Sequence, residues 1–486
     1  MKHLTILLIA SSFAILVSCS RGSAPSYDIS YRISFEPEKH YIDVRMLYAP
    51  SGQGNKKVTF KMPVWAPGYY MIMDYPKYVS DFEAYDVTGN PVKWDKSGKN
   101  QWVLESDGSL EVHYKVFADE VSVADSRVTS DGAFIAPNGV FLYKDIDHPV
   151  SVIIELPDGW SRISTALPFR DGVYEASDFD VLYDSPFLVG NHYSKSVEQD
   201  GCTYEFAVQS SQGFEESHID DDFLAGVREA VKIFHDTPYD SYHLLLLGRG
   251  PGGLEHQSSQ ACYTSGHWDF ETRERYLSEL RFLSHEYFHC YNVKAIRPIE
   301  LGPFDYDKEV FTPLLWFSEG ITCYYESVIL ERAGVETAQE HLDFLSRYIK
   351  DTEDTEGRKH MSLRQSSYDI WLNFFNRSAN SSKTTISYYV KGPVLGFLMD
   401  LKIQTTSGGE KSLDDLMNLL YWRYYKEKGR GFTEKEFWSA AEEVAGGSMD
   451  QIRRYVDTTE EMDYESILEP AGLHLDRDSW KLTYSK

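Results

Sequence analysis

The chain has 486 residues, and its 48 Lys and Arg side chains against 75 Asp and Glu side chains give a formal net charge of −27. At about 150 residues a domain, this length predicts two to four domains, each able to bury a core. Hydrophobic residues make up 42% and charged residues 25% of the chain, which excludes a mostly disordered protein. The negative charge repels phosphate backbones, so we expect no nucleic-acid partner.

The first residues have the pattern of a bacterial export signal. Lys2 and His3 precede an apolar run at residues 4–17, which is too short to span a membrane as a mature helix. The sequence LVSC at residues 16–19 resembles a lipobox, in which the cysteine is lipidated and becomes the new N-terminus. We therefore expect a lipoprotein signal peptide over residues 1–18 and a lipid anchor at Cys19.

A flexible tether is expected over residues 19–26, which are mostly small and polar. The expected location is the bacterial cell envelope, with the protein lipid-anchored and either facing the periplasm or in the outer membrane. An ordinary secretory signal that happens to contain a cysteine is the alternative.

Four further cysteines are too few and too scattered for a disulfide framework or a metal knuckle. They are Cys202, Cys262, Cys290 and Cys323. Small buried hydrophobic residues are the expectation for each of them. A single disulfide is the alternative, although the sequence does not show which two cysteines would form it.

Residues 27–196 have the pattern of a series of short β-strands. Apolar and polar residues alternate with period two in residues 27–35, 42–48, 58–62, 110–116 and 152–156. Turn signals rich in Gly, Pro and Asn separate these runs. The pattern predicts an N-terminal antiparallel β-sandwich over residues 27–196. No catalytic constellation is visible in it, so we expect this domain to support a site elsewhere.

The apolar period changes after residue 197. Residues 223–234 place apolar side chains on one face of a helix, and residues 243–247 read as a buried strand. Helical and strand patterns then mix, which predicts an α+β domain over residues 197–405. The glycines at residues 248–253 lack the lysine and the spacing of a phosphate-binding loop.

The strongest local signal is HEYFH at residues 285–289, in a stretch with helical apolar spacing. Residues four apart share one face of a helix, so His285 and His289 can present imidazole nitrogens to one ion. Glu286 is rotated away from that face and can hold a water molecule bound to the ion. The pattern HExxH predicts two zinc ligands and a general base. Two ordinary histidines on an amphipathic helix are the alternative.

A catalytic zinc ion needs a third protein ligand and an open position. The candidate oxygens downstream are Glu300, Asp305, Asp307, Glu309, Glu319 and Glu326. We favour Glu319, because Thr312 and Pro313 predict the start of a helix that LLWF at residues 314–317 commits to the core. A carboxylate inside such a helix needs a partner, and a zinc ion would serve. A glutamate at the solvent edge of the helix is the alternative.

Several longer motifs stand out around these residues and elsewhere: HEYFHCYNVK at residues 285–294, IRP at 296–298, LWFSEG at 315–320, MPVWAPGYY at 62–70, LYDSP at 182–186 and YYVKG at 388–392. Together they resemble the glycyl aminopeptidase family of zinc metallopeptidases. The resemblance covers nearly the whole mature chain. The family consists of gluzincins with a thermolysin-like catalytic domain and is related to aminopeptidase N.

The resemblance implies further site residues. The hydroxyl of Tyr389 would stabilise the transition state, and Tyr388 is the neighbour with which it could be confused. Glu255 would bind the free α-amine of the substrate, with Gly253 in the same substrate-binding segment. An ammonium held there fixes the register, so that only the first peptide bond reaches the metal. An ordinary loop carboxylate is the alternative for Glu255.

One departure from the family concerns the C-terminus. Members commonly continue into a PDZ domain, which we expect to be lacking here. Residues 406–486 instead predict a C-terminal helical region, with capping-box patterns at residues 412–415 and 433–436.

These observations predict a zinc-dependent metalloaminopeptidase, which removes N-terminal residues, small ones such as Gly or Ala, from peptides with a free N-terminus. One catalytic Zn²⁺ would lower the pKa of a bound water to about 7. Glu286 would take the proton as the water attacks and pass it to the leaving amine. A secreted zinc endopeptidase and a catalytically inactive surface binding protein on the same fold are the alternatives.

Overall fold

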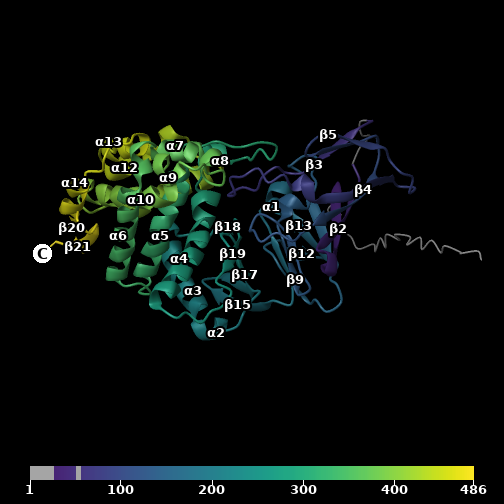
Figure 1. Cartoon of the computed structure of the whole chain (residues 1–486), viewed down its shortest axis with the longest axis horizontal. Helices are drawn as coiled ribbons and strands as arrows, with labels where there is room; N and C mark the ends of the chain where they lie inside the picture. The colour runs from purple at the N-terminus through teal and green to yellow at the C-terminus, as the bar shows by residue number, and fades with distance from the viewer. Residues whose placement is uncertain (1–26, 51–55, 486) are drawn as a thin grey trace, which may run out of the picture.

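The computed structural model describes residues 27–50 and 56–485. The expected signal peptide, the tether and Cys19 therefore lie outside the described residues. Figure 1 shows an N-terminal β-rich part and a larger part in which helices cover a sheet, with further helices toward the C-terminus. This arrangement confirms the expected fold class. None of the described helices is both long and apolar enough to cross a membrane.

The N-terminal part is built from three sheets that share one hydrophobic core. The largest has the order β12-β13-β10-β1-β2-β7-β4, with β12 (Phe169–Arg170), β13 (Val173–Ala176), β10 (Val150–Ile154), β1 (Ile29–Glu36), β2 (Tyr41–Tyr48), β7 (Leu110–Phe117) and β4 (Val79–Asp86). The second consists of β11 (Arg162–Ser164), β14 (Phe187–Gly190), β9 (Gly132–Ile135) and β8 (Arg127–Val128). The third consists of β3 (Val58–Lys61), β6 (Gln101–Leu104) and β5 (Trp94–Gly98).

Pairing in the largest sheet is mostly antiparallel, as expected, but β1 and β10 run parallel. Strand β1 has the burial pattern of its sequence, with Ile29, Tyr31 and Ile33 buried and the residues between them half-buried. Helix α1 (Phe179–Tyr183) follows β13 and ends at Asp184. This end of the β-rich part contacts the catalytic part, as described below.

The central sheet has the order β15-β16-β17-β19-β18. Its strands are β15 (Tyr193–Gln199), β16 (Cys202–Val208), β17 (Ser241–Arg249), β19 (Ser259–Thr264) and β18 (Gly253–Glu255). Strands β16, β17 and β19 run parallel, whereas β15 and β18 are antiparallel to their neighbours. The sheet begins at Tyr193, so the domain boundary expected at residues 196 and 197 falls inside β15. Strand β18 is the last in the order and carries Glu255.

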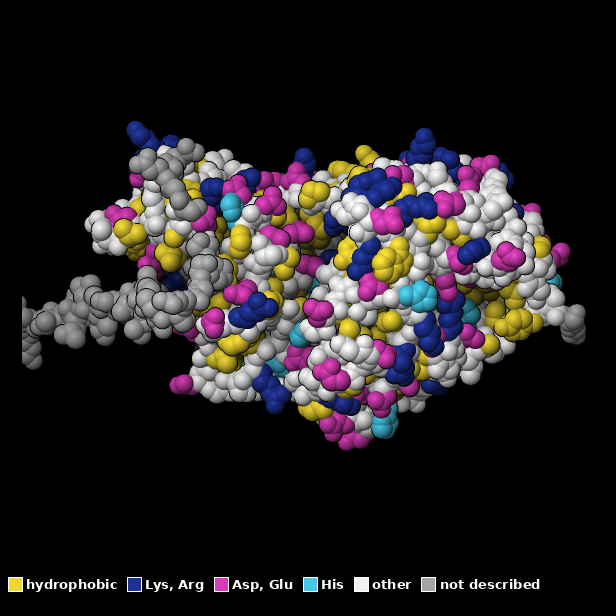
Figure 2. Space-filling view, turned by 180° about the vertical axis from the view of Figure 1, so that it is seen from behind, with side chains coloured by type: hydrophobic (Ala, Val, Ile, Leu, Met, Phe, Trp, Pro, Cys, Tyr) yellow, Lys and Arg dark blue, Asp and Glu magenta, His cyan; other side chains and the backbone are white. Residues whose placement is uncertain are grey.

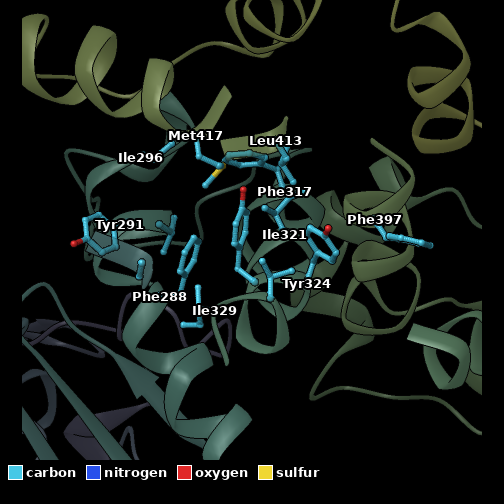
Figure 3. Packing of buried hydrophobic residues seen from close by; sticks show 14 of the residues in the cluster. Phe288, Tyr291, Ile296, Phe317, Ile321, Tyr324, Ile329, Phe397, Leu413 and Met417 are labelled. Carbon is cyan, nitrogen blue, oxygen red and sulfur yellow. The ribbon is translucent and has the colours of Figure 1, made fainter. Parts of the chain in front are cut away.

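Helices pack around this sheet and around one another. They are α2 (Phe214–Ser217), α3 (Ile219–Phe234), α4 (Arg273–Phe288), α5 (Thr322–Arg332), α6 (Ala338–Asp354), α7 (Leu363–Tyr368), α8 (Ile370–Asn373), α9 (Ser381–Thr384) and α10 (Tyr388–Thr406). Figure 3 shows how side chains from several elements interlock, with Phe288 next to Ile329 and Phe317 close to Leu413. These residues belong to one continuous buried cluster, which fixes the helices that carry the site.

Short helical turns join these elements. The 3-10 turns are η1 (Pro37–Lys39), η2 (Tyr75–Tyr78), η3 (Pro137–Gly139), η5 (Ile299–Leu301), η7 (Glu356–Lys359) and η9 (Glu469–Ala471). The π-helical segments are η4 (Cys290–Ala295), η6 (Trp316–Ile321) and η8 (Tyr421–Glu427). Two of the π-helical segments, η4 and η6, border the candidate site.

The C-terminal region consists mainly of α11 (Leu413–Leu420), α12 (Glu434–Ala445), α13 (Asp450–Asp457) and α14 (Glu465–Leu468). The expected capping boxes are present at Ser412 and Thr433. The expectation of helices alone is wrong in one respect, because the region ends in a hairpin of β20 (Leu473–Asp476) and β21 (Lys481–Tyr484). Leu473, Leu475 and Leu482 point into the core from these strands, which is why the hairpin forms.

The described cysteines agree with the expectation of small buried residues. All four described cysteines are buried and free, so no bridge forms among them. On the face drawn in Figure 2, acidic and basic side chains are interspersed.

Candidate metal centre

Helix α4 supplies the first two residues of the site. It begins after Thr272, whose side chain accepts a hydrogen bond from the amide of Arg275 and caps the first turn. His285 and His289 lie one turn apart near its other end, and both are buried. Their Nε2 atoms are 3.0 Å apart, so the two imidazoles converge on one point.

Glu319 brings a carboxylate to the same point. Its Oε2 atom lies 3.5 Å from His285 Nε2 and 3.3 Å from His289 Nε2. The predicted helix start at Thr312 and Pro313 is wrong by a few residues, because regular helix begins with η6 at Trp316. The amide of Trp316 is capped by the Ser367 hydroxyl at 2.9 Å, a contact from a distant element that no local signal indicates.

The outer nitrogens of both histidines already have partners. His285 Nδ1 lies 2.9 Å from Glu326 Oε2, and His289 Nδ1 lies 2.6 Å from the carbonyl oxygen of Asn292. Such contacts fix the ring orientation and leave the Nε2 lone pairs free for a metal. The sequence proposed Glu326 only as a direct ligand. Its position seven residues after Glu319 on one helix could have indicated a supporting role beside it.

The converging atoms fit a cation. Glu319 Oε2 is buried and has no hydrogen-bond partner within the described part of the chain. A buried, unpartnered carboxylate oxygen is costly unless an ion or a proton satisfies it. Two imidazole nitrogens and one carboxylate oxygen are a donor set that suits zinc and leave room for further ligands. The donors His285, His289 and Glu319 therefore form a candidate metal centre.

Glu286 lies beside the centre and not in it. Its carboxylate packs so closely on strand β18 that a Cβ on Gly253 would lie 2.2 Å from Glu286 Oε1, so only glycine fits there. Burial raises the pKa of Glu286 to about 7, against the opposing effect of the two histidines. The carboxylate is thus held next to the metal position with its proton affinity increased.

Two tyrosines at the start of α10 line the site. The ring of Tyr389 lies 6.3 Å from that of His285, and Tyr388 packs against Tyr389 at 4.7 Å. Both residues line the cavity in front of the metal position. Burial, with a contribution from Glu319, raises the pKa of Tyr389 well above its usual value, so the hydroxyl stays protonated and able to donate.

Glu255 reaches the centre from the edge strand β18. Carboxylate oxygens of Glu255 and Glu286 and a nitrogen of His289 all lie within 4.8 Å of one another. Gly68, from the N-terminal part, lies against Glu255 and has a backbone φ of +89°. A Cβ at this position would lie only 2.6 Å from Glu255 Oε1, so a larger residue would clash with the carboxylate. The buried Glu255 carboxylate thus lies between the two parts of the molecule.

A carboxylate from the N-terminal part braces the same strand. Asp184 Oδ1 lies 2.7 Å from Lys294 Nζ and 3.1 Å from His256 Nδ1, and Asp184 Oδ2 accepts a hydrogen bond from the amide of Gln257 at 2.8 Å. Burial alone would raise the pKa of Asp184, but the Lys294 ammonium and the His256 contact lower it to about 2. One side chain therefore links the residues after Glu255 to the segment after the metal helix.

An open cavity of about 580 Å³ gives access to the centre. His285 and Glu286 form part of its lining, together with the glycines of residues 252–253 and residues of the N-terminal part. Cys323 also lines it, with its Sγ 3.6 Å from His285 Nδ1. Of the site residues predicted from the sequence, His285, Glu286, Gly253 and Tyr389 line this cavity. Ligand atoms of His289, Glu319 and Glu255 lie within 4.8 Å of those of His285 or Glu286.

Comparison with known proteins agrees with this architecture. The sequence model of the Peptidase M61 N-terminal domain matches residues 30–191, and that of the M61 glycyl aminopeptidase matches residues 278–395. None of the curated proteins matches the chain.

Among solved structures, an aminopeptidase N family protein from Idiomarina loihiensis is similar, with a TM-score of 0.86 and 25% identity over 92% of this chain and 79% of that one. An M1 zinc metallopeptidase from Deinococcus radiodurans has a TM-score of 0.55 and 12% identity, over 89% of this chain and 94% of that one. Aminopeptidase A from Legionella pneumophila, solved with aspartic acid, has a TM-score of 0.55 and 11% identity, over 89% of this chain and 50% of that one.

Two domain models in the expected order and a similar solved structure along nearly the whole chain confirm the resemblance drawn from the motifs. The chain therefore belongs to the M61 glycyl aminopeptidase family and is a metalloaminopeptidase.

Proposed function

We propose that the protein is a zinc aminopeptidase that releases the first residue of peptides with a free N-terminus. The observation that carries this proposal is the place of Glu255, whose carboxylate lies within 4.8 Å of Glu286 and His289 ligand atoms. A second carboxylate so close to the catalytic one needs a cation beside it, and the α-ammonium of a peptide provides one.

His285, His289 and Glu319 would hold the zinc ion. When bound, zinc supplies Lewis-acid activation of a water molecule and of the substrate carbonyl. Glu286 accepts the proton of the attacking water and delivers it to the leaving amine. Tyr389 donates a hydrogen bond to the carbonyl oxygen as negative charge develops there.

The amine subsite fixes which bond reacts. With the ammonium bound to Glu255, the carbonyl of the same first residue is the one presented for attack, and only the first peptide bond reaches Glu286. Gly253, on strand β18, leaves room for the Glu286 carboxylate beside this subsite. In the family to which the chain belongs, glycine is the named first residue, and we propose small first residues, Gly or Ala, for this protein.

Chromogenic substrates test this function directly. We expect the purified protein to hydrolyse glycyl and alanyl p-nitroanilides, to lose this activity with a chelator, and to regain it with added zinc. N-acetylated versions of the same substrates should be poor, because an amide cannot replace the ammonium at Glu255. Efficient cleavage of N-acetylated peptides at internal bonds would instead identify an endopeptidase, and no cleavage of any peptide by zinc-loaded protein would identify an inactive binding protein.

We also infer a lipid anchor at Cys19 and a location in the bacterial cell envelope, from the lipobox-like LVSC at residues 16–19. Expressed in a bacterial host, the protein should be found in the membrane fraction with a lipid-modified N-terminus. Cys19→Ser should release it or stall its processing, as mass spectrometry of the N-terminal peptide would show. An unmodified, soluble wild-type protein whose N-terminus lies elsewhere contradicts the anchor.

A further inference from the structure

We propose that the cleft beyond the metal centre is an apolar subsite that binds the side chain of the second residue of the substrate, preferring aromatic and large aliphatic residues. The inference rests on the proposed aminopeptidase function, because the amine at Glu255 sets the direction of the peptide. It concerns the leaving side of the scissile bond, where the proposed function names no preference.

The direction of the substrate follows from α4. Glu255 lies at the His289 end of this helix, within 4.8 Å of the ligand atoms of Glu286 and His289. Phe282 is one turn before Glu286 on the same face, so it lies about 6 Å farther along the helix, on the side away from Glu255. Each peptide residue advances about 3.5 Å. The residue after the scissile bond therefore reaches the part of the cavity that Phe282 lines.

An unbroken row of aromatic rings forms a wall of this cavity. The ring of Tyr389, 6.3 Å from His285, is followed by Phe374 at 5.6 Å and then by Phe375 at 4.7 Å. Phe375 contacts Tyr69 of the N-terminal part at 4.5 Å, so the row crosses from one part of the molecule to the other. All of these residues line the cavity, and the row runs from a metal ligand to the rim.

These apolar surfaces are open to the cavity. Phe375 is 39% exposed, and Val121 of the N-terminal part, which also lines the cavity, is 41% exposed. Exposed large apolar side chains that gather at the mouth of a site mark a binding surface. Because these apolar side chains continue directly from the catalytic centre, we take the substrate itself as the molecule that binds them. An aromatic side chain of the substrate would cover them.

Charge argues against an acidic side chain in the same place. Glu286 and Glu326 line the cavity, and ligand atoms of Glu255 and Glu319 lie within 4.8 Å of those of Glu286 and His285, respectively. A bound zinc ion and the substrate ammonium would offset three of these four negative charges, and the one that remains would repel a further carboxylate in this partly enclosed space, where water screens charge less than in bulk. We therefore expect acidic second residues to be the poorest.

A series of tripeptides Ala-X-Gly tests the subsite, with X as Phe, Leu, Ser or Asp and release of alanine as the readout. We expect kcat/KM for Phe and Leu to exceed that for Ser by about tenfold or more, with Asp lowest, because apolar pockets discriminate by such factors. A parallel series X-Ala-Gly varies the first residue and should not show this preference for Phe.

Two variants locate the preference. Phe282→Ala and Phe375→Ala should each lower kcat/KM for Ala-Phe-Gly by about fivefold or more, while the value for Ala-Ser-Gly changes less than twofold. Leu372→Ala is the matched control, since Leu372 is 66% exposed, three residues before Phe375, and outside the lining of the cavity. It should leave both values unchanged.

The outcomes separate the two proposals. If the wild type cleaves Ala-Phe-Gly and Ala-Ser-Gly equally well, the subsite is wrong while the aminopeptidase function stands. A preference for Phe at the first position with none at the second also overturns the subsite, as does a second-position preference that both variants retain in full. Failure to release alanine from any tripeptide contradicts the proposed function instead.

Discussion

Glu286→Gln is expected to abolish most of the turnover while leaving the metal in place. The Glu286 carboxylate lies beside the converging donors, and we propose that it accepts the proton of the attacking water, which glutamine cannot do. Loss of a general base lowers the rate by about 10²–10⁴-fold. Metal analysis of the purified variant should give the zinc content of the wild type, and kcat for an alanyl substrate should fall by this factor with little change in KM.

Two controls make this result specific. Glu274→Gln introduces the same change on the same helix, at a side chain that is 78% exposed. This variant should keep the zinc content and the kcat of the wild type. Glu319→Ala and His285→Ala remove proposed ligands and should lose zinc as well as activity. A kcat near the wild-type value in Glu286→Gln would show that another group acts as the base.

The second large effect is expected at the amine subsite. Glu255→Ala removes the carboxylate that we propose to bind the ammonium, while the donors of the metal centre stay in place. Truncating one partner of a buried charge pair costs about 2–5 kcal/mol, which corresponds to on the order of 10²–10³-fold in kcat/KM. KM for free-amine substrates should rise, and the zinc content should not change. Glu255→Gln keeps the shape without the charge and should be nearly as impaired.

The approach of Gly68 offers an independent test of the same subsite. Gly68→Ala places a Cβ about where the Glu255 carboxylate lies, so it should raise KM for free-amine substrates. Gly89→Ala is the matched control, because Gly89 has a similar φ of +83° and nothing within 4 Å of its Cβ position. Equal KM values for the two variants, or full activity of Glu255→Ala, would contradict the proposed role of Glu255.

The metal donors could be anticipated because their geometry is local. His285 and His289 lie on one helix, so their spacing alone places them on one face. The prediction of Glu319 depends on an expected helix and on the resemblance to the family. The expected helix starts too early in the sequence. The amide of Trp316, at the start of this helix, is capped by Ser367, which lies 51 residues farther along the chain and cannot be recognised from the local sequence.

Contacts between distant segments could not be predicted from the sequence alone. Gly68 and Glu255 meet across the two parts of the molecule, and nothing in the sequence around either residue indicates this contact. The C-terminal hairpin is a different case, because Leu473 and Leu475 alternate with polar residues and indicate a strand. A prediction of helices alone overlooked that period, since the strands are only four residues long.

Because Asp184 links the two parts of the molecule, we expect the catalytic part to be unstable on its own. Cutting the chain between the β-rich part and the rest would leave the Lys294 ammonium, whose side chain is only 9% exposed, without its carboxylate. An uncompensated buried charge costs about 3–5 kcal/mol, a large share of the stability of a domain. The same cut would remove the contacts of Asp184 with His256 and Gln257, the two residues that follow Glu255. We therefore expect the catalytic part to need the β-rich part for its stability, and for the amine subsite that we propose at Glu255.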